Sequence, residues 1–129
     1  MTPRVLIVDD EPQVLNVLKD LVVSLGYTVV TANRAASAIA AVSAEPRPDA
    51  VLLDMTMPGS LNGLEALQVI KAHHPDLPVI MVTANIDEEL ARAALREGAL
   101  DYIMKPLNIA RLREVLAAAM LMIGKTPPS

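Results

Sequence analysis

Five polar residues stand directly after short apolar runs of this chain, and their types could do chemistry together. Asp9 and Asp10 follow residues 5–8, Asp54 follows residues 50–53, Thr83 follows residues 79–82, and Lys105 follows residues 102–104. Apolar runs of this length, bounded by turn residues, favour strands that are buried on both faces. Parallel strands bring their carboxyl ends to one edge of a sheet, where open α/β proteins place their chemistry. We therefore expect these five side chains to meet.

The chemistry of this set points to a metal ion and a phosphoryl group. Three carboxylates held together repel one another, and a cation among them offsets that repulsion. Oxygen ligands without His or Cys favour Mg²⁺. Lys105 supplies a second positive charge and Thr83 a hydroxyl donor, which suits a dianionic phosphoryl group. A carboxylate can accept such a group as an aspartyl phosphate. Asp54, the lone central carboxylate, is the best candidate nucleophile, and Asp9 and Asp10 would hold the metal.

The elements that must position these residues alternate along the chain. Strand candidates cover residues 5–8, 28–31, 50–53, 79–82 and 102–104, and a stretch with helical spacing of apolar residues follows each one. Pro12 suits a first helical turn, Asn62 with Glu65 and Asn85 with Glu88 form candidate capping boxes, and Asn108 is a candidate cap for the last helix. This alternation predicts an α/β fold with a five-stranded parallel sheet, doubly wound with helices on both faces and joined by right-handed crossovers.

Composition limits the classes of protein that the chain can represent. At 129 residues it is long enough for one domain with a real core. The net charge of −4 and the scattered basic residues give no footprint for nucleic acid. Cysteine is absent, which excludes disulfides and thiolate metal sites. The first apolar run is too short for a signal peptide, and no run reaches membrane-spanning length. We expect a cytoplasmic protein that binds neither nucleic acid nor membrane.

The motifs Asp9-Asp10, Asp54, Thr83-Ala84 and Lys105-Pro106, in this order and at these spacings, resemble the receiver domain of two-component response regulators, the domain type of chemotaxis regulators. The resemblance covers residues 1–124, and residues 125–129 are expected to be a tail or the start of a linker. It implies a single flavodoxin-like (βα)5 domain with strand order 2-1-3-4-5. It also implies that Asp54 accepts a phosphoryl group from a histidine kinase or a phosphotransfer protein, so that the domain is a regulatory phosphoacceptor and not a conventional enzyme.

The same resemblance assigns further roles. It implies Mg²⁺ bound by Asp10, Asp54 and the backbone carbonyl of Thr56, with Asp9 assisting, often through water. Thr83 and Lys105 would contact the phosphoryl oxygens, and Tyr102 would be the aromatic switch residue.

Other features of the family concern timing and output. The Lys105–Pro106 peptide bond is expected to be cis. Thr56 and Asn85 occupy the positions that tune the lifetime of the phosphoryl group. The loop of residues 58–63 is one residue longer than the common form. Output would pass through the face made by the fourth helix, fifth strand and fifth helix, to a downstream effector or a second copy of the chain.

Simpler explanations and other functions stand beside this interpretation. Asp alone favours turns and helix starts, and a half-buried Tyr102 would suit an edge strand without any switch role. His73 and His74 close a helix before Pro75, where cationic residues suit the helix dipole, and we expect both on the surface. The alternative functions are a flavodoxin-like cofactor carrier, a Mg²⁺-dependent aspartyl-phosphate hydrolase, and an interaction domain that works without phosphorylation. The acidic first loop argues against the first, chain length against the second, and the complete acidic set against the third.

Overall fold

The computed structural model describes residues 2–55, 62–84 and 88–128. Within these residues the strands are β1 (Arg4–Val8), β2 (Thr28–Ala32), β3 (Ala50–Asp54), β4 (Val79–Thr83) and β5 (Asp101–Met104). The helices are α1 (Pro12–Ser24), α2 (Ala35–Ser43), α3 (Gly63–His73), α4 (Glu88–Arg96) and α5 (Ile109–Met122). The alternation predicted from the sequence is therefore confirmed.

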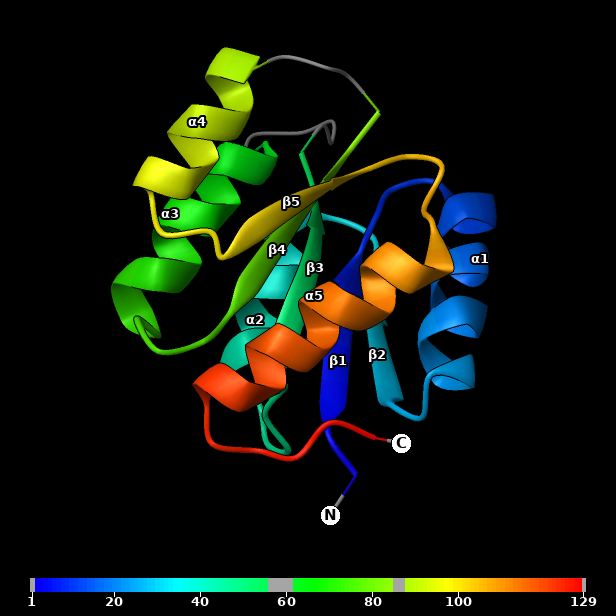
Figure 1. The fold of residues 1–129 in the computed structure, drawn as a ribbon. Helices are drawn as coiled ribbons and strands as arrows, with labels where there is room; N and C mark the ends of the chain where they lie inside the picture. Colours follow the sequence, from blue (N-terminus) through cyan, green and yellow to red (C-terminus); the bar gives the residue numbers. More distant parts are fainter. Residues whose placement is uncertain (1, 56–61, 85–87, 129) are drawn as a thin grey trace.

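The five strands form one parallel sheet in the order β2-β1-β3-β4-β5. This is the order that the family resemblance implied. Helices α1 and α5 cover one face of the sheet, and α2, α3 and α4 cover the other (Figure 1). The more polar strand β2 lies at one edge and β5 at the other, so β1, β3 and β4 fill the centre. The strands that carry the three aspartates are thus neighbours.

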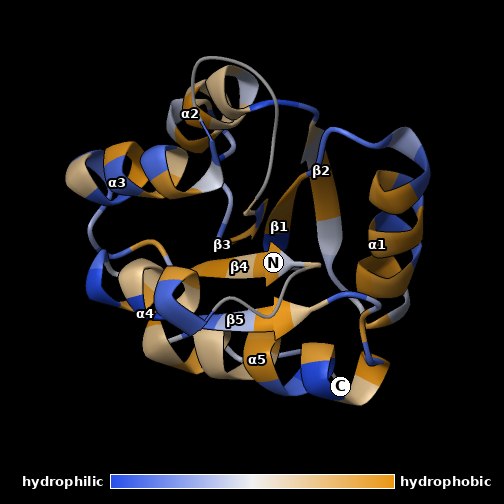
Figure 2. Ribbon diagram, turned by 90° about the horizontal axis from the view of Figure 1, so that it is seen from above, coloured by the Kyte–Doolittle hydropathy of each residue, from blue (hydrophilic) through white to orange (hydrophobic). Residues whose placement is uncertain are grey.

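Side chains of the central strands alternate between two cores. In β1, Val5 and Ile7 pack with α1 and α5, whereas Leu6 and Val8 pack with α2 and α3. All four are at most 1 % exposed. Figure 2 shows β1 and β4 mostly in the colour of hydrophobic residues. A strand with both faces buried needs apolar residues at every position, which explains the continuous runs in the sequence.

Three helix starts follow the local chemistry of the sequence. Helix α1 begins at Pro12. Asn62 and Glu65 form a capping box at α3, in which the Glu65 N–H donates to Asn62 Oδ1 at 2.9 Å and the Asn62 N–H donates to Glu65 Oε1 at 3.3 Å. The Asn108 side chain accepts from the backbone of Ala110 and Arg111 at the start of α5. These predicted caps are confirmed, whereas Asn85 lies outside the described residues.

At the end of α5 the chain turns back beneath the sheet (Figure 1, red). Gly124 adopts φ +75°, a left-handed conformation that favours glycine. The next N–H, from Lys125, donates to Met120 O at 2.9 Å and closes the helix end. We call residues 125–128 the C-terminal strap.

The strap contacts residues that precede two strands, and one of these residues links it to a third strand. Lys125 Nζ forms an ion pair with Asp49, which directly precedes β3. The other carboxylate oxygen of Asp49 accepts the Arg4 N–H of β1 at 2.8 Å. Pro128 lies on the turn before β2, where a methyl group on Gly26 would stand 2.6 Å from Pro128 Cβ. The amino end of the sheet is therefore closed by contacts between residues far apart in the sequence.

Within the described part of the chain, no helix has the length and apolar character needed to cross a membrane.

Candidate functional site

Three aspartates gather at the carboxyl edge of the sheet. Asp54 is the last residue of β3, and Asp9 and Asp10 directly follow the neighbouring strand β1. Each can offer one carboxylate oxygen to a common point, because these oxygens lie within 4.8 Å of one another. Asp9 is fully buried and Asp54 is 4 % exposed, while Asp10 is half-buried. The meeting of these side chains at one edge, expected from the sequence, is present in the structure.

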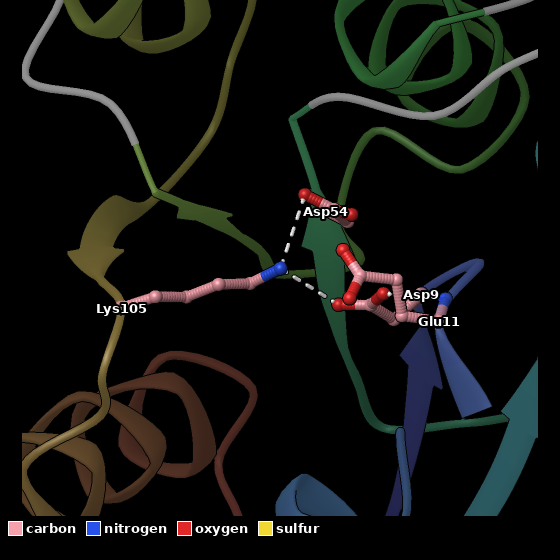
Figure 3. A network of polar contacts seen from close by, with 4 residues as sticks. All are labelled: Asp9, Glu11, Asp54 and Lys105. Carbon is pink, nitrogen blue, oxygen red and sulfur yellow. Dashed lines mark hydrogen bonds and ion pairs between the residues drawn. The ribbon is translucent and has the colours of Figure 1, made fainter. Parts of the chain in front are cut away.

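Lys105 reaches this cluster from the loop after β5 (Figure 3). Its Nζ donates a hydrogen bond to Asp9 Oδ2 at 2.9 Å and lies 3.6 Å from Asp54 Oδ1. The Lys105 side chain is only 17 % exposed. The peptide bond between Lys105 and Pro106 is cis. One ammonium group therefore bridges the carboxylates of two strands.

Charge around Lys105 decides its protonation. Burial by itself would lower the pKa of the ammonium group, but the hydrogen bond to Asp9 and the charges of Asp54, Asp9 and Glu11 outweigh it, so the pKa stands above its ordinary value. Lys105 is thus firmly cationic at neutral pH. Asp9, Asp54 and Glu11 act on this ammonium group, and Asp10 lies in the same cluster, so among the described residues the carboxylates outnumber the cation.

Backbone hydrogen bonds hold the ends of the strands in place. Met55, directly after Asp54, donates its N–H to Val82 O at 2.9 Å. Lys105 donates its N–H to Thr83 O at 2.8 Å, which ties the loop after β5 to the end of β4. Thr83 is 6 % exposed and lies at the same edge as the aspartates. The fold therefore places Thr83 beside the strand that carries Asp54.

The remaining expected residues differ in what the structure shows. Tyr102 lies in the edge strand β5, opposite Met81, and its side chain is 36 % exposed. Thr56 and Asn85 lie outside the described residues. His73 and His74 lie at the end of α3, where their rings contact Val69 O and Ser43 Oγ, both at 3.0 Å. His73 is exposed, as predicted, whereas His74 is half-buried and links the end of α3 to Ser43 at the end of α2.

Two neighbours of the site were not singled out from the sequence. Glu11 donates its backbone N–H to Asp9 Oδ1 at 3.0 Å and orients that carboxylate. Gly63 donates its N–H to Met55 O at 3.2 Å, which joins the start of α3 to the residue after Asp54. An Asn-Gly pair opening a helix was visible in the sequence, but its contact with the acceptor strand was not.

The donor set fits a hard divalent cation. Three carboxylates converge without a sulfur or imidazole ligand among them, and two are buried with an excess of negative charge. Mg²⁺ prefers such oxygen ligands and needs only one or two carboxylates, since it keeps several waters. The chemistry of Asp9, Asp10 and Asp54 therefore suits a magnesium ion.

Comparison with known families agrees with this geometry. Residues 5–117 match the response regulator receiver domain family. The chain belongs to that family. The acidic cluster is thus the acidic pocket of a receiver domain, a class of domain from two-component systems that interacts with histidine kinases. This explains why the carboxylates, the lysine and the threonine share one edge of the sheet.

Individual relatives are regulatory proteins several times longer than this chain. The nitrogen assimilation regulatory protein NtrX of Azorhizobium caulinodans is 42 % identical over 113 residues, which cover 87 % of this chain and 25 % of the relative. The regulatory protein AtoC of Escherichia coli is 37 % identical over 117 residues, covering 91 % and 25 % respectively. The chain therefore spans about a quarter of the length of these curated relatives.

Solved structures show the same fold. The receiver domain of NtrX from Brucella abortus superposes with a TM-score of 0.84 at 38 % identity, covering 89 % of this chain and 96 % of that one. A CheY-like receiver domain from Methanospirillum hungatei superposes with a TM-score of 0.87 at 30 % identity, covering 96 % and 98 %. The receiver fold therefore accounts for nearly the whole chain.

Proposed function

We propose that this domain is a Mg²⁺-dependent phosphoacceptor in which Asp54 receives a phosphoryl group from a histidine kinase or a phosphotransfer protein. The observation that carries the proposal is the convergence of Asp9, Asp10 and Asp54 on one point, with Lys105 Nζ 2.9 Å from Asp9 and 3.6 Å from Asp54. Asp9 and Asp54 are buried, which argues against the simpler explanation that these carboxylates are solvated turn residues. Membership of the receiver family supports the same phosphoacceptor chemistry.

Asp54 is the nucleophile in this proposal. One of its carboxylate oxygens attacks the phosphorus atom in line, so that an O–P bond forms as the P–N bond of the donor phosphohistidine breaks. The donor imidazole leaves with the electron pair and takes up a proton from solvent. Lys105 offsets charge on the transferring oxygens, and the Thr83 hydroxyl contacts the new phosphoryl group. The chain would thus catalyse its own phosphorylation and dephosphorylation, as a regulatory phosphoacceptor and not a conventional enzyme.

Asp10 and Asp54 would hold the magnesium ion, with Asp9 assisting and the backbone carbonyl of Thr56 as a further ligand. Bound there, the ion supplies positive charge that stabilises the oxygens of the transferring group. Asp9 is fully buried, hydrogen-bonded to Lys105 and to the Glu11 N–H, so it orients the neighbouring groups more readily than it can move toward a ligand. That arrangement favours an assisting role for Asp9.

An apolar groove beside the site suits the protein that donates the phosphoryl group. Val14, Val17 and Leu21 of α1 line it on one side, and Lys105 and Leu107 line it on the other. Val17 is 59 % exposed, which is high for valine. Since the groove shares Lys105 with the site, a donor docked here would bring its phosphohistidine next to Asp54. We infer that the donor covers this groove.

Output would pass through the face made by α4, β5 and α5. Large apolar side chains are exposed on these three elements: Leu90 and Leu95 of α4, Tyr102 of β5, and Ile109, Leu121 and Met122 of α5. Ile109 is the first residue of α5 and is 41 % exposed. We propose that the phosphoryl group draws Thr83 toward it, that Tyr102 then turns inward, and that an effector or a second copy reads the population shift.

The boundaries of the receiver domain and its location are also proposals. We place the domain at residues 1–124 in the cytoplasm, with residues 125–129 as a tail or the start of a linker. The ion pair of Lys125 with Asp49 and the contact of Pro128 with Gly26 support docking of this segment on the domain in either case. Thr56 and Asn85 would tune the lifetime of the phosphoryl group.

Acetyl phosphate tests the proposed function directly. The wild-type chain should incorporate one phosphoryl group in the presence of Mg²⁺ and none after chelation with EDTA. Asp54→Asn and Asp54→Ala should abolish incorporation because the nucleophile is gone. Mg²⁺-dependent labelling that survives at another residue in these variants would refute the assignment. Tyr27→Phe, which alters a buried residue of the α1 core, serves as a control that should label like the wild type.

A further inference from the structure

The start of helix α3 is in contact with the backbone of the acceptor residue. Gly63 is the first residue of α3 and is buried. A methyl group on Gly63 would lie 2.2 Å from the carbonyl oxygen of Asp54, and 2.7 Å from both Cα and the carbonyl oxygen of Met55. Carbon and oxygen atoms ordinarily approach no closer than about 3.3 Å. The site is therefore short of space for a methyl group by roughly 1 Å.

The atoms in the way cannot turn aside, since all three belong to the backbone. Met55 is held from two sides: its N–H donates to Val82 O at 2.9 Å, and its carbonyl accepts the Gly63 N–H at 3.2 Å. Asp54 is itself a residue of the central strand β3, paired with β4 through Val82. A side chain at position 63 must therefore move either the helix start or the end of the acceptor strand.

The helix start is also held in place. The capping box of Asn62 and Glu65 ties the first turn of α3 to the residue before it. Ala66 and Leu67, one turn further on, are fully buried in the core against the sheet. Neither partner of the contact is free to yield, so the absence of a side chain at Gly63 sets the distance between them.

We propose that Gly63 is a positioning residue for phosphoryl transfer: by letting the start of α3 touch the Asp54 and Met55 backbone, it places the Asp54 carboxylate relative to Asp9, Asp10 and Lys105. This proposal rests on the proposed function of Asp54. Conformational freedom is not the reason for glycine here, because Gly63 does not adopt a positive φ. At such a helical position alanine is ordinarily more stable than glycine. A loss of stability or of labelling rate in Gly63→Ala would therefore be caused by the close contact with the Asp54 and Met55 backbone.

The experiment compares the rate constant of labelling with its amplitude. Gly63→Ala is treated with acetyl phosphate at saturating Mg²⁺, at a temperature where circular dichroism shows it folded. Because a 1 Å misplacement of reacting groups can cost about 100-fold in rate, we expect the rate constant to fall roughly 10- to 100-fold. The Mg²⁺ concentration for half-maximal rate should rise, since Asp54 is one of the three carboxylates. A loss of stability alone would lower the labelled fraction and leave the rate constant of folded molecules unchanged.

Gly26→Ala is the matched control. It makes the same substitution at a glycine with φ +100° that precedes β2, at the amino end of the sheet and away from both the acidic cluster and the output face. Strain at that position should reduce stability without changing the rate constant. A rate constant for Gly63→Ala within about twofold of the wild type, well inside the loss expected for a displaced nucleophile, would overturn the proposal. If the wild type itself takes up no phosphoryl group, the proposed function fails instead.

A measurement on the wild type covers the case in which Gly63→Ala does not fold. The Gly63 N–H is bonded to the residue after Asp54, so its amide resonance should shift when Mg²⁺ and beryllofluoride, a phosphoryl mimic, are added. The Gly26 amide, in the turn before β2 at the amino end of the sheet, should not shift. An unshifted Gly63 resonance at saturation would contradict the coupling of α3 to the acceptor.

Discussion

The two ends of the sheet contain opposite kinds of ion pairing. At the carboxyl end, among the described residues, Asp9, Asp54 and Glu11 act on one ammonium group, that of Lys105, and Asp10 joins the same acidic cluster. At the amino end, Asp49 has one ammonium partner, Lys125, and one backbone N–H partner, Arg4. Among the described residues, carboxylates therefore outnumber ammonium groups in the cluster at the first end, whereas Asp49 and Lys125 pair one to one at the second. Uncompensated charge costs stability and persists where function needs it, so we assign chemistry to the carboxyl end and structural support to the amino end.

The largest effect on stability is expected for Lys105→Ala. Removing the ammonium group leaves Asp9, which is fully buried, without its cationic partner. The free energy of unfolding without metal should fall by about 2–4 kcal/mol, somewhat below the cost of breaking a fully buried pair. Urea unfolding checks this.

Two further measurements on Lys105→Ala test whether Lys105 acts in metal binding or in coupling phosphorylation to output. A magnesium titration of Lys105→Ala should show an affinity no weaker than that of the wild type, because a competing cation has been removed, while beryllofluoride should no longer perturb Tyr102. Weaker Mg²⁺ binding would mean that the role of Lys105 is wrongly assigned. The control is Lys125→Ala at the other end of the sheet, where an exposed pair should contribute less than about 1 kcal/mol.

An intermediate effect is expected for Asp49→Ala. The change removes the acceptor of the Arg4 N–H and the partner of Lys125 at once. Leaving such groups unpaired costs about 1–3 kcal/mol in the free energy of unfolding. The rate of labelling by acetyl phosphate should stay at the wild-type value. If labelling slowed in proportion to the loss of stability, the assignment of chemistry to the carboxyl end and of structural support to the amino end would be contradicted.

The smallest effect is expected for Asp10→Asn, and it has the opposite sign. Removing one negative charge from the cluster relieves repulsion, so the free energy of unfolding without Mg²⁺ should rise by about 1 kcal/mol. Affinity for Mg²⁺ should fall in the same variant. Thermal melts with and without Mg²⁺ measure both changes. A lower free energy of unfolding for the metal-free variant would show that repulsion among the aspartates does not reduce the stability of the wild type.

The two ends also differ in how well the sequence predicts them. Asp9, Asp10, Asp54, Thr83 and Lys105 each follow an apolar run, so the rule that parallel strands end at one edge was enough to bring them together. The strand order came from the family resemblance, because periodicity along the chain carries no information about which strands are neighbours. Local caps at Asn62 and Asn108 were predictable since their partners lie within three residues.

Contacts without a local signal could not be predicted. Asp49 and Lys125 are 76 residues apart, and nothing in the surrounding pattern pairs them. The burial of Gly63 against Asp54 depends on how α3 packs, and the exposure of Ile109 depends on where α5 begins relative to the sheet. Each is decided by tertiary packing that spacing along the chain does not encode.

The most direct test of the central claim is to locate the phosphoryl group itself. Wild-type chain phosphorylated by acetyl phosphate with Mg²⁺ is reduced with borohydride, which marks an acyl phosphate, and the modified residue is identified by tandem mass spectrometry. The account predicts modification of Asp54 alone, lost when Mg²⁺ is chelated. Modification of Asp9 or Asp10, or of Asp54 to the same extent without Mg²⁺, would contradict it.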